Sequence, residues 1–199
     1  MRQRNRVICG ISVFFITYSV VLILWIQVKP YYGNTLTHVG SRLAAWSAGF
    51  RVETVHHGKE VATITFAYTV LTKHGMGDIL LDVKIAVSQY SFNVPLTFAL
   101  VAGLFPFFRW RVRSLIEACF ILLFIHLLCI YFFCSLQLFY HLAQAGVKTP
   151  SKTVPFFLQF MWAFADNMII RFEPFLVAVY LWFRNRERTR MVRRKRRKK

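Results

Sequence analysis

Polar side chains are concentrated in the last long apolar run of the chain, which extends over 155–183. Such groups are costly to bury in hydrocarbon, so within a spanning helix they point to function. The positions are Gln159, Asp166, Asn167, Arg171 and Glu173. A regular helix places the first four on one face, called here the polar stripe. Glu173 points elsewhere, beside Pro174, which weakens the helix.

The side chains of the polar stripe are suited to polar contacts with another helix. It could be a contact site for a partner's helix or for the spanning segment of a substrate. It could instead supply hydrogen bonds between helices of the same chain, which only hold the bundle together. A transport path is disfavoured, because the sequence shows neither inverted repeats nor a run of charged pairs.

Other polar residues within the apolar runs fall at similar depths. Depth is obtained by counting about 20 residues per hydrocarbon core, starting from the basic residues that border each run. The count predicts an outer polar layer of Asn93, Gln137, His141, Asp166 and Asn167. It places a second set deeper: His126, Arg171 and Glu173.

The sequence does not predict a catalytic nucleophile. Cys134 is the candidate thiol, and His126 and His141 share its predicted helix. Each histidine is about two helical turns from the thiol, too far for an activating hydrogen bond. We therefore expect that the chain by itself is not an enzyme.

No metal site or cofactor is expected either. His56, His57 and His74 lie in turns at opposite ends of one predicted strand. The strand separates these turns by roughly 30 Å, which excludes a shared metal ion. The four cysteines all fall inside apolar runs, and their irregular spacing fits neither a zinc motif nor a disulfide framework.

Composition indicates that the helices that carry these side chains lie in a membrane. Hydrophobic residues make up 56% of the chain, which leaves too few polar residues for the surface of a soluble domain. Four apolar runs are long enough to be spans, at 7–28, 92–108, 114–141 and 155–183. The first of them is predicted to be an uncleaved signal anchor.

Basic residues set the predicted orientation. The net charge is +18, and most of the 26 Lys and Arg residues precede the first run, form the turn at 109–113 or lie beyond residue 183. Positive charge beside a spanning helix marks the cytoplasmic side. Both termini are therefore predicted to be cytoplasmic, and residues 29–91 extracytoplasmic.

Periodicity predicts the structure of residues 29–91. An amphipathic helix over 34–48 is indicated by apolar residues at helical spacing: Leu36, Val39, Leu43, Trp46 and Phe50. Alternation of apolar and polar residues predicts strands at 62–70 and 81–87, after a shorter strand at 51–55.

Turn signals at 57–59 and 75–78 bracket the middle strand. The three strands are therefore predicted to form an antiparallel meander, which is small enough to need support from the membrane helices.

The predicted fold is thus a membrane α-helical bundle of four transmembrane helices. A small extracytoplasmic α+β insert lies between the first and second helices. The parts are 1–28 (N-terminus and anchor), 29–91 (insert), 92–183 (three further helices) and 184–199 (basic cytoplasmic tail).

The tail ends in an unbroken run of basic residues. It contains Arg193, Arg194, Lys195, Arg196 and Arg197, with two lysines after them. Such a run could bind RNA, but a basic cluster just inside a membrane helix more simply fixes topology and contacts anionic lipid head groups. We therefore expect membrane lipids as its partner, and no nucleic acid.

The junction between the last strand and the second run has a distinctive sequence. Residues 89–100 read QYSFNVPLTFAL. This stretch resembles the "YSFN-PL-AL" junction of the exosortase H-associated membrane proteins. The layout is also similar across nearly the whole chain, with one anchor, an outer β segment, the Arg-rich turn at 109–113 and two further spans.

The resemblance implies a bacterial inner-membrane accessory of a protein-sorting system. In such systems a separate transpeptidase-like membrane enzyme processes proteins that carry a C-terminal sorting signal. This chain lacks the Cys/Arg/Arg arrangement expected of that enzyme, and the family brings no catalytic residues to carry over. The expected role is a non-enzymatic assembly or sorting subunit, whose partner is an exosortase-like enzyme or its substrate. The alternative is a small carrier or channel component that uses the polar stripe.

Overall fold

The computed structural model describes most of the 199-residue chain. The described residues are 3–58, 61–72, 75–86, 91–107, 112–147, 151 and 153–197, with side chains described except at 72, 112 and 187–197. Predictions that concern His74, the strand end at 87, the turn at 109–111 and the side chains of the tail lie outside this set.

The chain divides into two compact units. Unit one comprises Met1–Val28, Asn93–Leu123 and Arg171–Lys199. Unit two comprises Lys29–Phe92 and Phe124–Ile170.

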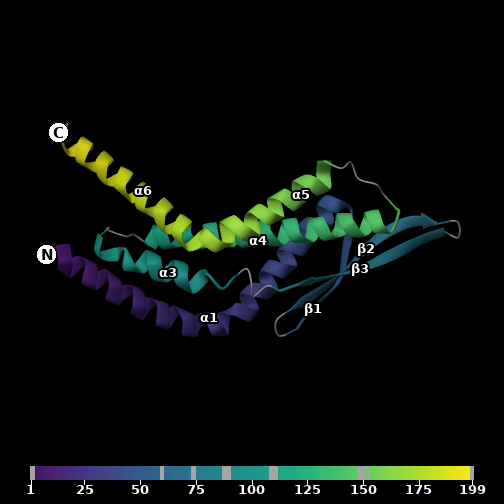
Figure 1. The fold of residues 1–199 in the computed structure, drawn as a ribbon, viewed down its shortest axis with the longest axis horizontal. Coiled ribbons are helices and arrows are strands. Elements are labelled where there is room, and N and C mark those ends of the chain that lie inside the picture. Colours follow the sequence, from purple (N-terminus) through teal and green to yellow (C-terminus); the bar gives the residue numbers. More distant parts are fainter. Residues whose placement is uncertain are drawn as a thin grey trace. The chain divides into compact units, whose positions relative to one another are not determined.

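The first helix is much longer than the sequence predicts. Helix α1 extends over Gln3–Ala48 and passes through Pro30 (Figure 1). The sequence predicts two separate helices, at 7–28 and 34–48. Proline removes a backbone hydrogen bond and favours a helix end, yet α1 continues through Pro30. Both stretches are helical, but they belong to one continuous element. Its first part lies in unit one and its second part in unit two.

Three helical stretches are long and apolar enough to span a membrane, by length and composition alone. They are Gln3–Ala48, Arg113–Gln144 and Thr153–Arg186. The second belongs to α4 (Val112–Gln144). The third contains α5 (Thr153–Phe164), the π-helical turn η2 (Ala165–Ile170) and the start of α6 (Arg171–Arg197). Three of the four predicted spans are therefore confirmed as candidate spans.

The fourth prediction, a span over 92–108, is only partly confirmed. Helix α3 covers Val94–Gly103, and a 3-10 turn, η1, comes after it at Phe105–Phe107. Ten residues of α-helix measure about 15 Å, half of the roughly 30 Å hydrocarbon core. Pro106 lies in the 3-10 turn, where its missing N–H prevents the α-helix from continuing.

The predicted three-stranded antiparallel meander is confirmed in unit two. Its strands are β1 (Arg51–His57), β2 (Ala62–Thr72) and β3 (Gly75–Ile85), in the spatial order β1-β2-β3. Strands β2 and β3 pair without interruption, whereas a bulge interrupts the pairing of β1 with β2 between Val52 and Thr54.

The turn predicted over 75–78 is wrong. These residues begin β3 and pair in register with the end of β2, from Thr72 opposite Gly75 to Thr69 opposite Asp78. The connection therefore lies at 73–74, outside the described residues. Gly75, the first residue of β3, has a φ of 121°, a conformation that other residues rarely adopt.

Small residues form the buried stripe on the second part of α1. The stripe contains Leu36, Thr37, Gly40, Ser41, Ala44 and Ala45, all buried in unit two. A Cβ on Gly40 would lie 2.6 Å from Cγ2 of Ile130 in α4, so the two helices approach closely only because residue 40 is glycine. Close approach through small residues is typical of membrane helices.

The apolar face predicted for this part of α1 is largely exposed. Leu36 and Phe50 are buried, but Val39, Leu43 and Trp46 are exposed. The predicted helix is present. Most of its predicted apolar stripe does not pack against the rest of unit two, because the buried stripe around Gly40 does so instead.

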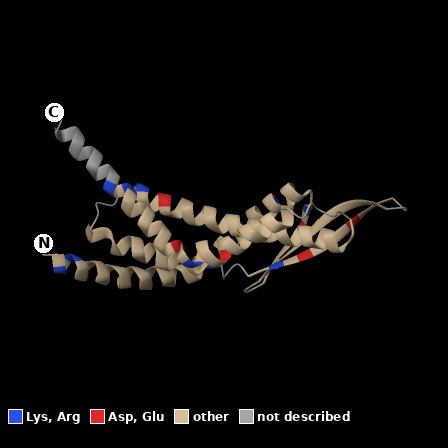
Figure 2. Ribbon diagram, turned by 45° about the horizontal axis from the view of Figure 1, so that its top comes forward, with Lys and Arg blue, Asp and Glu red and all other residues tan. Residues whose placement is uncertain are grey.

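Unit one has a small core formed by α3, α4 and α6. Its buried members are Val101, Ala118, Val177 and Leu181. The first part of α1 contacts α3 where a Cβ on Gly10 would lie 2.8 Å from the Gly103 carbonyl oxygen. Lys and Arg residues mark the start of α1 and part of the described stretch of α6, and the strands carry both acidic and basic residues (Figure 2).

Candidate partner-binding surfaces

The predicted polar residues divide between the two units. Unit one holds Asn93, Arg171 and Glu173, and unit two holds His126, Gln137, His141, Gln159, Asp166 and Asn167. The buried ones are Asn93, His126 and Glu173, and the exposed ones are Gln159, Asn167 and Arg171. Each unit is therefore considered by itself.

The π-helical turn η2 carries the centre of the polar stripe. It includes Asp166, which is half-buried, and Asn167, which is exposed. The side-chain amide of Asn167 donates a hydrogen bond to the Ala163 carbonyl at 3.0 Å. Turns of this kind are rare and are frequent at functional sites. The exposed amide of Asn167 is a group that a partner within the membrane can bind.

The spacing of buried residues shows the extra residue of the π turn. Buried positions continue after Ile170 at intervals of three or four residues, at Glu173, Val177 and Leu181. Between Ala165 and Ile170 the interval is five, as in an i→i+5 helix. The sequence predicts a regular helix through this stretch and does not reveal the π turn.

Gln159 has a partner within unit two. The Tyr140 hydroxyl of α4 donates a hydrogen bond to Oε1 of Gln159 at 3.3 Å. Interhelical hydrogen bonds in membranes contribute about 0.6 kcal/mol on average. This member of the polar stripe therefore matches the second interpretation, in which polar groups hold helices together.

His126 is also held within unit two. Its Nδ1 lies 2.7 Å from the Tyr32 hydroxyl of α1, and the two rings meet edge to face. The imidazole is completely buried, so it is available neither to a substrate nor to a partner. The sequence does not reveal Tyr32 as the partner, because 94 residues separate it from His126.

Two polar groups of unit one are buried, and one is exposed. Glu173 in α6 and Asn93, which precedes α3, have almost no exposed surface. Thr97 lies one turn after Asn93, and its hydroxyl donates a hydrogen bond to the Asn93 carbonyl at 3.0 Å. Arg171 is exposed at the start of α6. A guanidinium exposed beside apolar residues is accessible to a partner within the membrane.

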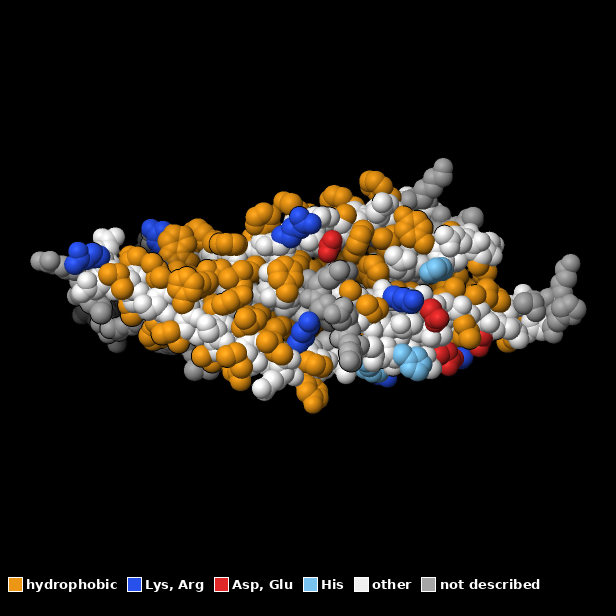
Figure 3. Space-filling view, turned by 60° about the horizontal axis from the view of Figure 1, so that its bottom comes forward, with side chains coloured by type: hydrophobic (Ala, Val, Ile, Leu, Met, Phe, Trp, Pro, Cys, Tyr) orange, Lys and Arg blue, Asp and Glu red, His pale blue; other side chains and the backbone are white. Residues whose placement is uncertain are grey.

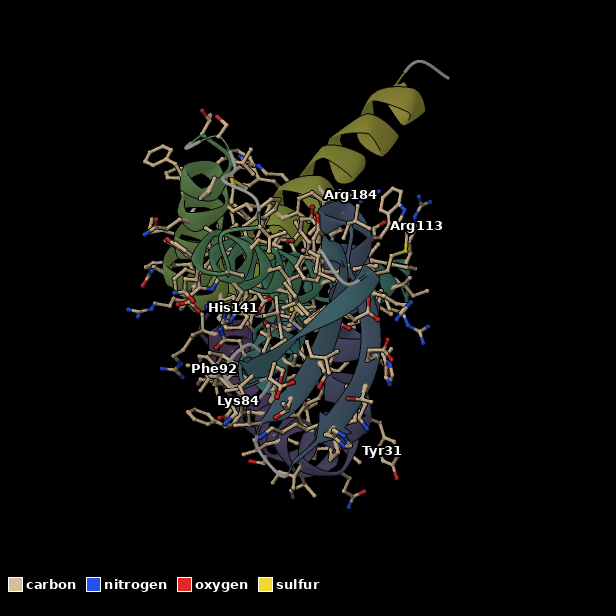
Figure 4. The ribbon with its side chains drawn as sticks, turned by 90° about the vertical axis from the view of Figure 1, so that its right-hand side faces the viewer. Tyr31, Lys84, Phe92, Arg113, His141 and Arg184 are labelled. Atoms are coloured by element: carbon tan, nitrogen blue, oxygen red, sulfur yellow. The ribbon has the colours of Figure 1, made fainter. Side chains whose placement is uncertain are left out.

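Glu117 organises a polar network in unit one that the sequence does not reveal. One of its carboxylate oxygens accepts a hydrogen bond from Arg113 at 3.1 Å, and the other lies 2.8 Å from the Arg184 guanidinium. Arg184 also donates a hydrogen bond to the Tyr180 hydroxyl. Figure 4 shows the labelled Arg113 and Arg184 near each other. The carboxylate thus ties α4 to α6 at the end of the predicted span.

The outer face of the sheet carries hydrogen-bonded polar side chains. The hydroxyls of Thr65 and Thr69 in β2 donate to the carboxylates of Asp82 and Asp78 in β3, both at 2.7 Å. Arg51 donates to Glu53 and Asp78, and the hydrogen bond and charge of Glu53, with the charge of Asp78, raise the pKa of its guanidinium. Acidic side chains therefore cluster over the strands, whereas hydrophobic side chains cover much of the remaining face in Figure 3.

Strand β3 has one paired edge and one edge that no described strand covers. Large apolar side chains stand on its outer face, with Met76 83% and Leu80 62% exposed. An unpaired strand edge of this length is a template for an added strand. Strand β1 is the other edge of the sheet, but it is shorter and carries the bulge.

Unit two is expected to lose stability in mild acid. Partial burial, and after it the positive charges of His38 and His56, lowers the pKa of His57 below its usual value. The rings of His38 and His57 are 5.8 Å apart. Because the unfolded chain binds the proton more readily, stability is fully present above about pH 6.5 and falls as the pH drops toward the lowered pKa.

The measurement is the unfolding midpoint of the purified protein at pH 7.5 and at pH 5.5. His57→Gln should reduce the difference between the two midpoints, whereas His141→Gln, on helix α4, should leave it unchanged. An unaltered pH dependence in His57→Gln would contradict the assignment.

Comparison with known proteins adds one finding. A family model described as exosortase H-associated membrane protein matches residues 4–187, which is nearly the entire chain. No curated protein and no solved structure matches the chain.

Proposed function

The chain belongs to the family of exosortase H-associated membrane proteins, and we propose that it acts as a non-enzymatic accessory subunit of an exosortase-type protein-sorting system. Family membership and the long apolar helices make it a membrane protein associated with exosortase H. The proposed role is to bind the sorting enzyme or its substrate in a bacterial inner membrane. The partner would bind the insert of residues 29–91 and exposed polar groups within the membrane.

The proposed topology has four crossings, with both termini cytoplasmic and residues 29–91 periplasmic. The basic residues that border the apolar runs support it, because they accumulate on the cytoplasmic side. The second crossing then consists of α3 and η1 together with flanking residues. A short crossing of this kind requires local thinning of the bilayer or side chains that reach to its interface.

The observation that carries the proposal is the open edge of β3. An extended segment of the partner would pair with this edge by backbone hydrogen bonds, and its side chains would meet Met76 and Leu80. Without a bulge on β3, its backbone groups stay aligned for pairing along the strand. Within the membrane, Asn167 and Arg171 each supply an exposed polar group.

The test is copurification of the exosortase-like enzyme with tagged variants of the full chain. Leu80→Lys introduces a charge on the outer face of β3, and lysine on an edge strand opposes pairing. We expect about tenfold less partner to be recovered, equivalent to a loss of roughly 1.4 kcal/mol. Thr54→Lys is the matched control, since Thr54 is exposed on the opposite edge strand. Equal recovery with Leu80→Lys and Thr54→Lys would exclude the β3 edge as the contact.

The carrier alternative predicts a different result. A transport path needs polar groups along one route, yet in unit two Gln159 and Asn167 are exposed whereas His126 is buried. Replacement of Asp166 and Arg171 by alanine separates the alternatives. Lost copurification supports the accessory role, whereas lost solute flux with intact copurification supports the carrier.

A further inference from the structure

Unit one contains an open apolar groove of about 590 Å³. Helix α1 lines it with residues between Val7 and Phe15, α3 and η1 with residues between Leu100 and Phe107, and α6 with residues between Phe175 and Trp182. Every lining residue is apolar or glycine. The groove therefore presents an almost entirely apolar surface, which suits a hydrocarbon occupant.

Two glycines and one alanine make room for the groove. Gly10 and Gly103 bring α1 and α3 so close that a Cβ on Gly103 would lie 3.1 Å from Cβ of Phe14. Ala178 lines the groove from α6, and aromatic residues surround the small ones. A larger side chain at Ala178 would fill the space, whereas one at Gly10 or Gly103 would force α1 and α3 apart.

One end of the groove is basic. Trp182 lines this end, and the Arg186 guanidinium lies 5.7 Å from the centre of its ring. Val7 lines the same end from α1, directly after the exposed Arg6. Arg184 is already paired with Glu117. Among the described residues of unit one, Arg6 and Arg186 have no carboxylate partner, so their charges are available to a ligand.

The length of the groove matches one leaflet of a bilayer. The stretch of α1 from Val7 to Phe15 measures about 12 Å, close to half of the roughly 30 Å hydrocarbon core. An acyl chain that begins at the arginine end would therefore remain within the leaflet on that side.

We propose that the groove binds one acyl chain of an anionic phospholipid, whose phosphate lies at Arg6 and Arg186. Charge complementarity favours this occupant over a zwitterionic lipid, because the ammonium group of a zwitterionic lipid offsets the attraction of its phosphate to the two arginines. Basic pockets between membrane helices are known to bind anionic head groups. The proposal requires neither the partner nor the orientation proposed above, because the arginines mark the head-group end on whichever side they lie.

The test is native mass spectrometry of the full chain, delipidated in detergent and titrated with phosphatidylglycerol or phosphatidylethanolamine. We expect one phosphatidylglycerol per chain to bind more tightly than phosphatidylethanolamine. Two arginines correspond to a preference of about thirtyfold. Arg6→Gln with Arg186→Gln should bring the ratio of the two affinities to about one, whereas Arg42→Gln, on an exposed face of unit two, should leave it unchanged.

A second variant tests the acyl site separately. Ala178→Phe fills the groove and should weaken phosphatidylglycerol binding at least about tenfold. Leu176→Phe, at an exposed α6 position outside the groove, should have no effect. If Ala178→Phe alters the fold, as circular dichroism would show, Val179→Phe on the groove wall replaces it. Equal affinity for the two lipids in the wild-type chain would overturn the proposal. So would unchanged binding in a folded groove variant, or a protein helix found in the groove by crosslinking.

Discussion

Replacing Gly40 by alanine is expected to destabilise the chain by about 2 kcal/mol. The new Cβ would lie 2.6 Å from Cγ2 and 3.1 Å from Cβ of Ile130, which is buried in α4. Neither helix can move away without opening the core of unit two. The measurement is unfolding by sodium dodecyl sulfate in mixed micelles, monitored by tryptophan fluorescence.

A double-mutant cycle provides the control for this prediction. Ile130→Ala removes Cγ2 at the cost of a cavity, so Gly40→Ala should be much less harmful in that background than in the wild-type chain. Asn34→Ala, on an exposed face of the same helix, should have little effect. If the costs of Gly40→Ala and Ile130→Ala simply add, the close contact is not what limits the helix spacing.

Replacing Glu117 by glutamine is expected to cost about 2 kcal/mol. The value lies between that of an exposed ion pair, at most about 1 kcal/mol, and that of a buried pair deprived of one partner, about 3–5 kcal/mol. The Glu117 side chain is 16% exposed and meets Arg113 and Arg184 on different helices. Without its charge, two guanidinium groups share one region with no carboxylate between them.

The two arginines provide an internal comparison. Arg184 is 31% exposed and Arg113 is 70% exposed, so Arg184→Gln should destabilise the chain more than Arg113→Gln in the same unfolding assay. Glu53→Gln, which removes an ion pair of the sheet surface, should have no measurable effect. A larger effect of Glu53→Gln than of Glu117→Gln would refute the assignment of Glu117 as the organising carboxylate.

The sheet could be predicted because its sequence signal is local. Alternation over 62–70 and 81–87 reports which side chains face the core, and Ile64, Phe66, Val83 and Ile85 are indeed buried. The turn at 75–78 is misplaced by the sequence pattern because two glycines resemble a loop. In the structure these glycines belong to a strand, since pairing with Val70 and Thr72 overrides their local preference.

The packing face of the second part of α1 could not be predicted from hydrophobicity. The periodicity of Val39, Leu43 and Trp46 indicates an apolar face, which in water would be the buried one. In this chain the neighbouring helix instead contacts Gly40 and the small residues beside it. Close packing between helices selects for small size, a property that a hydrophobicity pattern does not measure.

The candidate polar residues can be identified by type, but their surroundings depend on tertiary structure. Residue type and predicted depth in the membrane select His126 and Glu173 as candidate contact residues, yet the side chains of both are buried. Tyr32 and Glu117 are not selected in this way, although each organises a polar contact between helices. Tyr32 meets His126 across 94 residues of sequence, and Glu117 meets Arg184 of another helix, so no local spacing reveals these two contacts.

The π turn at Ala165–Ile170 gives this stretch of unit two one residue more than an ordinary helical turn needs. Deleting one residue, for example the exposed Met168, would shorten the interval between the buried residues Ala165 and Ile170 from five to four, which is a same-face interval of a regular α-helix. Both side chains would stay on one face, so the buried side of this stretch would be kept. The same deletion in a regular stretch of helix would instead turn every following side chain by about 100° about the helix axis. The π turn is thus the position in this helix at which the loss of one residue is best tolerated.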